Sequence, residues 1–320
     1  MSALSEPPLD AVFRRREHFD PINERRLASR VERGEIVRVG PGAFAAARAW
    51  DGLEPMDRHA QRVWEAASRL EAGTVLSHFA AAALHGADVL GDWPDRVDVS
   101  VDRKSGGRST GRVRRHTRRL DELDVIPWGR HFVTSVVQTA IDLAAMLPFA
   151  EGVATADQVL WSRREGGPLA TPDDLQRAAD RFGGRGQARV QRVVAFASPQ
   201  ADSVRESQSR VIIEQLGFPR PRLQREFLLP SGRRAFTDFS WDEWDHVGEY
   251  DGLGKYLDPV LRRGRTPEQV LADEKDREDE LRRVVRVVSR WRTRQLERPA
   301  LLYDVLTRAG LPTTRPRPGF

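Results

Sequence analysis

The sequence predicts an α/β protein with more than one domain, and three observations support this. Stretches with apolar residues at helical spacing alternate with stretches that have the two-residue period of a strand, such as 97–101. The chain of 320 residues is long enough for two or three cores. It contains no run of the roughly 20 apolar residues that would cross a bilayer, so no membrane partner is expected.

Arginine dominates the charge of the chain. The sequence has 52 Lys and Arg against 47 Asp and Glu, a net charge of +5. Guanidinium groups suit phosphate, so nucleic acid is the favoured partner, although a GC-rich genome also raises arginine content. The sequence has no cysteine, which excludes disulfides and thiolate zinc sites. Together with the lack of a secretory leader pattern, this predicts a cytoplasmic protein.

Residues 1–50 are expected to form a small domain of helices followed by a hairpin. Leu27 and Val31 would face its core. Helices followed by a hairpin with a glycine tip describe a winged helix. The expected elements are helices over 10–18 and 21–33 and strands over 35–39 and 43–45.

A basic face runs along the second of these helices. Arg26, Arg30 and Arg33 recur at helical spacing. In a winged helix they would contact the phosphates or base edges of DNA. A solvated helix face in an arginine-rich protein explains them equally well.

Residues 51–165 are expected to form an α/β middle domain, and residues 166–200 a helical linker. Gly183–Gly186 lacks a preceding strand and a following Lys-Ser/Thr, so it is interpreted as a turn rather than a phosphate loop. The expected helices cover 60–70, 79–84, 135–147, 157–161, 173–182 and 187–196, and the expected strands cover 97–101, 113–116 and 132–133.

The first half of the chain resembles AbiEi-type antitoxin-like regulators. This resemblance implies an N-terminal winged helix and a mixed α/β middle domain, over about residues 10–162. It is carried by the wing hairpin, Leu76-Ser77-His78-x-x-Ala81-Ala82, the strand at 97–101, Val133-Thr134-Ser135 and Asp142-Leu143-Ala144.

Five histidines are scattered through this half without metal-ligand spacing. We interpret them as structural or exposed residues. They are His59, His78, His85, His116 and His131.

Residues 201–320 are expected to form a third domain, an α/β sandwich. The expected order is helix, three strands, helix, strand, helix. The elements are a helix over 202–216, strands over 223–229, 235–241 and 246–250, a helix over 267–282, a strand over 284–288 and a final helix.

The hairpin of this domain carries a group of carboxylates. If its turn centres on Glu243-Trp244, Asp238 lies opposite Glu249, and Asp251 projects from the same face. Three like charges this close call for a cation. Oxygen ligands suit Mg²⁺ or Mn²⁺, and we expect no other charge compensation before such an ion binds.

Two more residues extend this candidate site. Lys255 follows Gly252 and Gly254, a flexible turn that would bring its ammonium over the carboxylates. Glu206, on the preceding helix, would add a fourth carboxylate. A group of acidic residues with one lysine is typical of the active site of a metal-dependent nuclease. Surface acids on a solvated hairpin tip are the alternative interpretation.

The stretch Asp238-Phe239, then Glu249-x-Asp251-Gly252 and Lys255, resembles the PD-(D/E)XK nuclease superfamily, in the branch similar to very-short-patch-repair (Vsr) endonucleases. The resemblance covers about residues 202–311. It implies that Asp238 and Glu249 ligate the metal and that Glu206 is the acid of the first helix. The usual lysine two residues after the second acid is Asp251 here, and Lys255 takes the place of a basic residue found in the related branch.

Two functions follow from the sequence. The first is a Mg²⁺-dependent endonuclease that acts on DNA, with RNA left open as a substrate. The second is a non-catalytic transcriptional regulator or antitoxin, with a vestigial nuclease fold and an unidentified toxin or self-association partner. Trp241, Trp244 and Trp291 are either stacking residues for bases or core anchors.

Overall fold

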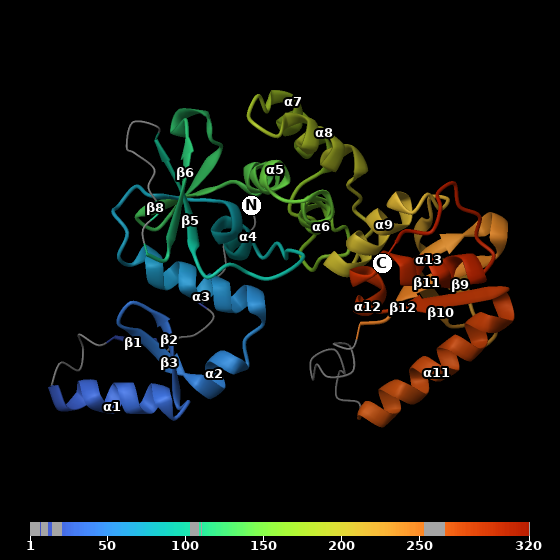
Figure 1. Ribbon diagram of the computed structural model, residues 1–320, viewed down its shortest axis with the longest axis horizontal. Helices are drawn as coiled ribbons and strands as arrows, with labels where there is room; N and C mark the ends of the chain where they lie inside the picture. The colour runs from blue at the N-terminus through green and yellow to red at the C-terminus, as the bar shows by residue number, and fades with distance from the viewer. Residues whose placement is uncertain are drawn as a thin grey trace. The chain divides into compact units, whose positions relative to one another are not determined.

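The computed structural model describes residues 7, 12–14, 21–102, 109, 111–252 and 266–319 (Figure 1). The chain divides into two compact units, residues 1–160 with 167–197 and residues 161–166 with 198–320. Both units combine helices with sheets, so the α/β class is confirmed. The predicted division of the first half at residue 50 stays a prediction.

The first unit contains two sheets and the helices around them. The strands are β1 (Phe13–Arg14), β2 (Ile36–Gly40), β3 (Ala43–Ala46), β4 (Val75–Leu76), β5 (Val97–Asp102), β6 (Val113–Arg118), β7 (Val125–Trp128) and β8 (His131–Thr134). The helices are α1 (Pro21–Glu32), α2 (Ala47–Asp51), α3 (Pro55–Ala67), α4 (His78–His85), α5 (Val136–Met146), α6 (Phe149–Leu160), α7 (Pro172–Arg181) and α8 (Gln187–Phe196).

The N-terminal sheet has the order β1-β3-β2 and contains the predicted hairpin. The helix predicted over 10–18 is wrong where it can be compared, because Phe13–Arg14 pairs with β3 as a strand. Most of that stretch lies outside the described residues. Val31 is 39% exposed and not part of a core, whereas Leu27 is half-buried.

The second sheet of this unit has the order β6-β5-β4-β8-β7 and packs on α3 and α4 through Leu76, Val99 and Val133. Ser135 caps α5 by accepting a hydrogen bond from the Gln138 N–H. Helices α7 and α8 pack on α5 and α6, so they belong to this unit, and the predicted linker is wrong in that respect.

The second unit has a four-stranded sheet of order β12-β11-β10-β9, in which β11 and β12 run parallel and the other pairs are antiparallel. The element order is the predicted one. The elements are α9 (Val204–Gln215), β9 (Arg222–Leu228), β10 (Arg234–Trp241), β11 (His246–Tyr250), α11 (Pro267–Val284), β12 (Val287–Trp291), α12 (Thr293–Glu297) and α13 (Pro299–Arg308).

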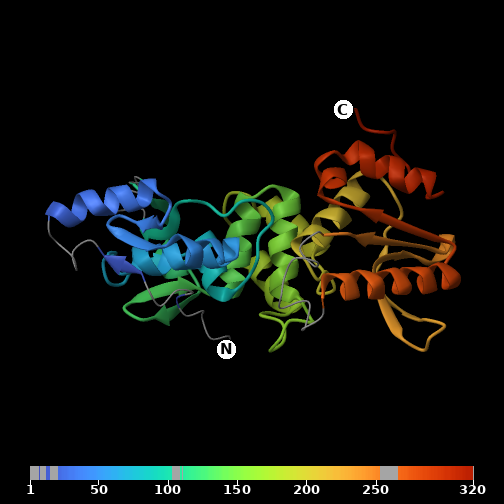
Figure 2. The same ribbon diagram turned by 90° about the horizontal axis from the view of Figure 1, so that it is seen from below.

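Helices cover both faces of this sheet (Figure 2). On one face Leu281 and Val285, from α11 and its end, pack against Val247 of β11. On the other face α9, α12 and α13 pack against two tryptophans, Trp241 and Trp291. Each buried apolar side chain of this size contributes about 1.5–3 kcal/mol to stability.

Gly248 of β11 allows this tryptophan packing. A Cβ at this position would lie 2.5 Å from the Trp291 ring and 3.1 Å from the Trp241 ring. Trp241 and Trp291 are only 2% and 1% exposed, so they are core residues and do not stack on bases. The strand predicted at 284–288 begins three residues later, because α11 continues through Val284.

Candidate functional site

The candidate site lies where the hairpin of β10 and β11 opens. A short 3-10 turn at Asp242–Trp244 joins the strands, and Phe239 pairs with Gly248 and Trp241 with His246. This is the register predicted from the turn. Continuing it by one residue sets Asp238 opposite Glu249.

The Asp238 side chain accepts a hydrogen bond from the backbone of the neighbouring strand β11. The Tyr250 N–H donates to Oδ2 of Asp238 at 2.8 Å, which fixes the carboxylate beside β11. On its other side β10 pairs with β9. Thr237 pairs there with Arg225, and the next pair is Phe239 with Leu223. Gln224 stands between these pairs with φ of +50°, a rare conformation for a non-glycine residue. Such strain is typical of functional sites.

Glu206 begins α9 and faces this irregularity. Ser203 caps the helix, and the Glu206 carboxylate accepts hydrogen bonds from the Ser203 hydroxyl at 2.9 Å and from the Asp202 N–H at 2.9 Å. The strained Gln224 donates to it from Nε2 at 3.0 Å. These donors are all neutral, and they hold the carboxylate in place without neutralising it.

Glu206 and Asp238 interact as like charges. Burial, and next the negative charge of Asp238, raise the pKa of Glu206 to about 8. A cation bound near both carboxylates would relieve this repulsion. The structure therefore brings together the helix acid and the first hairpin acid.

Glu249 has different neighbours. Its carboxylate is 9% exposed and accepts a hydrogen bond from Arg277 Nη2 at 2.7 Å, while Arg290 Nη2 lies 2.9 Å from its other oxygen. Glu274 binds both arginines, at 2.9 Å from Arg277 and 2.8 Å from Arg290. The prediction that Glu249 lacks charge compensation is wrong, because a buried carboxylate needs a cation and two arginines supply it.

Asp251 is also paired. Arg292 donates from Nε and Nη2 to Oδ2 of Asp251, at 2.9 and 2.6 Å. Within the described residues, no group of three or more His, Cys, Asp or Glu side chains is arranged to hold a metal ion. Asp238, Glu249 and Asp251 are therefore not a preformed three-carboxylate site. Lys255 lies outside the described residues.

The three arginines, Arg277, Arg290 and Arg292, were not expected from the sequence to contact the hairpin acids. Glu274 and Arg277 stand three residues apart on α11, the spacing of neighbours on a helix face. Arg290 is the direct partner of Glu249 across the parallel strands. The helical spacing was readable from the sequence, but the strand pairing was not, because the apolar pattern favours a strand that ends before Arg290.

The predicted DNA-contacting arginines of α1 lie on the surface. Arg26, Arg30 and Arg33 are exposed. Arg30 and Arg33 both pair with Glu35, at 3.2 and 2.7 Å. Exposed pairs of this kind contribute little to stability and exchange easily with other anions.

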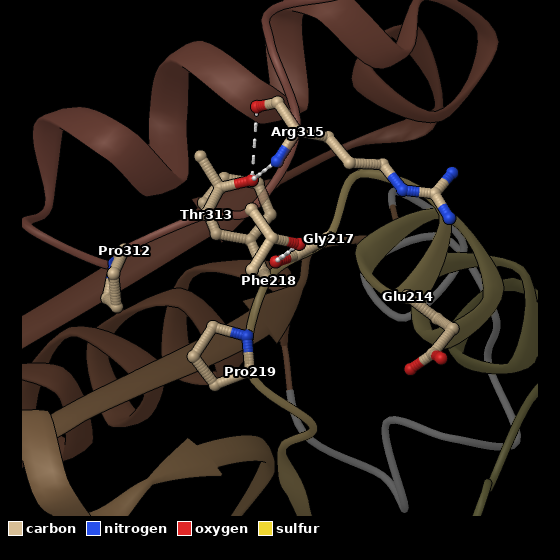
Figure 3. Close-up of a pocket in the computed structure, with 8 residues that line it drawn as sticks. Glu214, Gly217, Phe218, Pro219, Pro312, Thr313 and Arg315 are labelled. Carbon is tan, nitrogen blue, oxygen red and sulfur yellow. Dashed lines mark hydrogen bonds between the residues drawn. The ribbon is translucent and has the colours of Figure 1, made fainter.

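A pocket of about 400 Å³ lies elsewhere in the second unit (Figure 3). It is formed by Glu214–Pro219 at the end of α9 and by Pro312–Arg315 of the C-terminal segment. Gly217 is required there, because its φ is +74° and an added Cβ would meet Thr314 Oγ1 at 2.6 Å. None of the predicted site residues that the structure describes lines this pocket.

In the described part of the chain, no helix has the length and apolar character needed to cross a membrane. No protein-family profile matches the chain. The chain is similar to two Mycobacterium tuberculosis proteins named Uncharacterized protein MT2308 (strain CDC 1551 / Oshkosh) and Uncharacterized protein Rv2248 (strain ATCC 25618 / H37Rv). Each match is 28% identical over 127 residues, covering 40% of this chain and 45% of the relative, so the chain matches less than half the length of these relatives.

Proposed function

We propose that this chain is a DNA-binding protein whose second unit hydrolyses phosphodiester bonds with Mg²⁺. The observation that carries the proposal is the pair formed by Glu206 and Asp238. Their mutual repulsion raises the pKa of Glu206, after the larger effect of burial. A cation between them would remove this repulsion.

The pair fits Mg²⁺ better than the three hairpin acids do. Mg²⁺ usually binds through one or two carboxylates and retains several waters. Glu206 and Asp238 would hold it, in place of the predicted set Asp238, Glu249 and Asp251, because arginines already neutralise Glu249 and Asp251. A bound Mg²⁺ would polarise the phosphate and lower the pKa of a water.

The residues around the pair support this role. The Tyr250 N–H and Gln224 Nε2 orient the two carboxylates, as supporting groups do in metal sites. Metal binding requires Glu206 to lose its proton, so binding should release protons near neutral pH. The resemblance to PD-(D/E)XK nucleases and the surface arginines of α1 favour DNA as the substrate.

The direct test is incubation of the protein with supercoiled plasmid and with single-stranded DNA, with and without Mg²⁺ or Mn²⁺. We expect metal-dependent cleavage that Asp238→Asn and Glu206→Gln abolish. Glu243→Gln at the exposed hairpin tip is the matched control and should leave cleavage unchanged. A folded wild-type protein that binds DNA and cleaves none of these substrates would contradict hydrolysis.

The second candidate is the non-catalytic regulator or antitoxin. The ion pairs of Glu249 with Arg277 and Arg290, and of Asp251 with Arg292, favour it, because they occupy two of the three acids that the sequence predicts as metal ligands. Under this proposal, duplex binding would be the same in wild type and Asp238→Asn, and Mg²⁺ would not alter the stability of either.

A further inference from the structure

A cationic stripe lies on the edge strand of the first unit. Among the described strands, β6 pairs with β5 alone and ends its sheet. Arg114, His116 and Arg118 alternate along β6, so they share one face. In the parallel register Arg114 stands beside Asp98 and His116 beside Ser100.

Two buried carboxylates, those of Asp98 and Asp142, contact the basic side chains of this stripe. His116 Nε2 lies 2.7 Å from Oδ1 of Asp98, and Arg114 Nε lies 3.5 Å from the same oxygen. Arg118 pairs with Asp142 of α5, which also accepts a hydrogen bond from Gln138 at 3.1 Å. Both carboxylate side chains are 0% exposed, whereas Arg114, His116 and Arg118 are 35%, 17% and 25% exposed. In each of these pairs the basic side chain is therefore the more exposed partner.

A stacking contact also orients the imidazole ring of His116. The ring of His78 stacks on it, with centroids 3.7 Å apart and planes 13° apart. His78 is buried with φ of +50°, a strained conformation, and its Nδ1 lies 3.0 Å from the Ser77 hydroxyl. Ser100 donates to the same hydroxyl at 2.9 Å. This support keeps His116 in one orientation at a cost in backbone strain.

Among the residues that the structure describes, the two carboxylates use only part of the donors of the stripe. Asp98 contacts only Nε of Arg114, and Asp142 only Nη2 of Arg118, which leaves most N–H groups of each fork unused by these carboxylates. Within the described residues, the hydrogen bond of His116 is made through Nε2, and Nδ1 has none. The guanidinium donors of Arg114 and Arg118 match the oxygens of a phosphate group. His116 directs Nε2–H to Asp98, so its Nδ1 adds a donor on the same face when the imidazole is protonated.

We propose that Arg114, His116 and Arg118 form a phosphate-binding site, and that its occupant is a backbone phosphate of a nucleic-acid strand. The site itself rests on the geometry of β6. The choice of occupant rests on the proposed DNA-binding function. This surface belongs to the first unit and is separate from both α1 and the carboxylate pair, so it adds a contact that neither provides.

The test uses the full chain in two measurements. Inorganic phosphate is titrated at constant ionic strength, with the imidazole signals of His116 followed by NMR and assigned through His116→Gln. The affinity for labelled single-stranded and duplex oligonucleotides is measured by fluorescence anisotropy. The variants are Arg114→Gln and the paired change Arg118→Gln with Asp142→Asn, which avoids a buried unpaired carboxylate. The control is Arg115→Gln, which removes the same charge from the opposite face of β6.

We expect phosphate to shift the His116 signals saturably and more than chloride does. Arg114→Gln should weaken phosphate and oligonucleotide binding by about tenfold, and Arg115→Gln should not. No saturable shift, or an equal loss with Arg115→Gln, would overturn the site. Phosphate binding with unchanged oligonucleotide affinity in Arg114→Gln would overturn the nucleic-acid occupant. If duplex binding fails in the wild type but phosphate still binds at His116, the proposed DNA-binding function fails and the phosphate site stands.

Discussion

Glu249 and Arg290 are direct partners across the parallel strands β11 and β12, and their side chains meet with Nη2 of Arg290 2.9 Å from Oε2 of Glu249. Arg277 of α11 binds the other carboxylate oxygen at 2.7 Å. One carboxylate thus joins two strands and a helix. The acid that the sequence suggested as a metal ligand has a structural partner set of its own.

The first prediction concerns this carboxylate. Glu249→Ala should lower the free energy of unfolding by roughly 1–3 kcal/mol, because it leaves Arg277 and Arg290 without a mostly buried partner. The sequence alone suggested the opposite sign, through relief of repulsion. Urea denaturation of the full chain measures the change. Asp251→Asn is the matched control and should cost less than about 1 kcal/mol, since Arg292 is 60% exposed. An equal cost in both variants would contradict a special role for Glu249.

The second prediction concerns pH. The folded chain holds the Glu206 proton up to about pH 8, whereas an unfolded glutamate releases it near 4.5. This contribution to stability is complete below pH 4.5 and is lost as pH rises through 8. We expect the free energy of unfolding to fall by up to about 5 kcal/mol over this range. Glu206→Gln should flatten the fall, and Glu214→Gln, on the exposed side of the same helix, should retain it. A steep fall that persists in Glu206→Gln would assign it to another group.

The third prediction concerns α1. Arg26→Ala with Arg30→Ala should weaken duplex binding and lower the slope of log K against log salt by about 0.9 for each phosphate that the protein no longer neutralises. Glu35→Gln should act in the opposite direction, because it releases Arg30 and Arg33 from their ion pairs. Fluorescence anisotropy at several salt concentrations measures both. Unchanged slopes in all variants would mean that these arginines contact only solvent.

The fourth prediction concerns Gly248. An added Cβ would meet the buried Trp291 ring at 2.5 Å, and neither tryptophan has space to move away. Gly248→Ala should therefore destabilise the second unit by about 1–3 kcal/mol, the usual cost of overpacking. Thermal unfolding followed by tryptophan fluorescence measures this loss. Gly319→Ala is the control, because that residue is exposed, its φ is not left-handed and nothing lies within 4 Å of the added Cβ.

The local pattern of the second unit was readable from the sequence. The hairpin register followed from the turn between Trp241 and His246, because short polar turns fix the pairing of the flanking strands. The helix that carries Glu206 also followed from local signals, and the structure adds its cap at Ser203. The chemistry of the carboxylates did not follow, because it depends on contacts between distant segments.

Two residues illustrate the limit. Arg290 neutralises Glu249 only because β12 lies parallel to β11 in one register, and no local pattern encodes that register. His116 meets His78 only because β6 is the neighbour of β5, and no local spacing relates these two residues. The periodicity of a segment predicts which of its faces is buried, but not which distant side chains cover that face.

The parallel pairing of β11 and β12 has a consequence for the order of folding. Asp251 and Arg292 are 41 residues apart in sequence, and β12 is the last strand of its sheet to leave the ribosome. During synthesis the hairpin acids therefore emerge before the arginines that neutralise them. Non-local pairings of this kind form slowly, because a long loop must close first. We expect the carboxylate site to assemble last. A chain stopped before β12 would retain Arg277 as a partner for Glu249 but would lack Arg290 and Arg292, and its sheet would have an open edge.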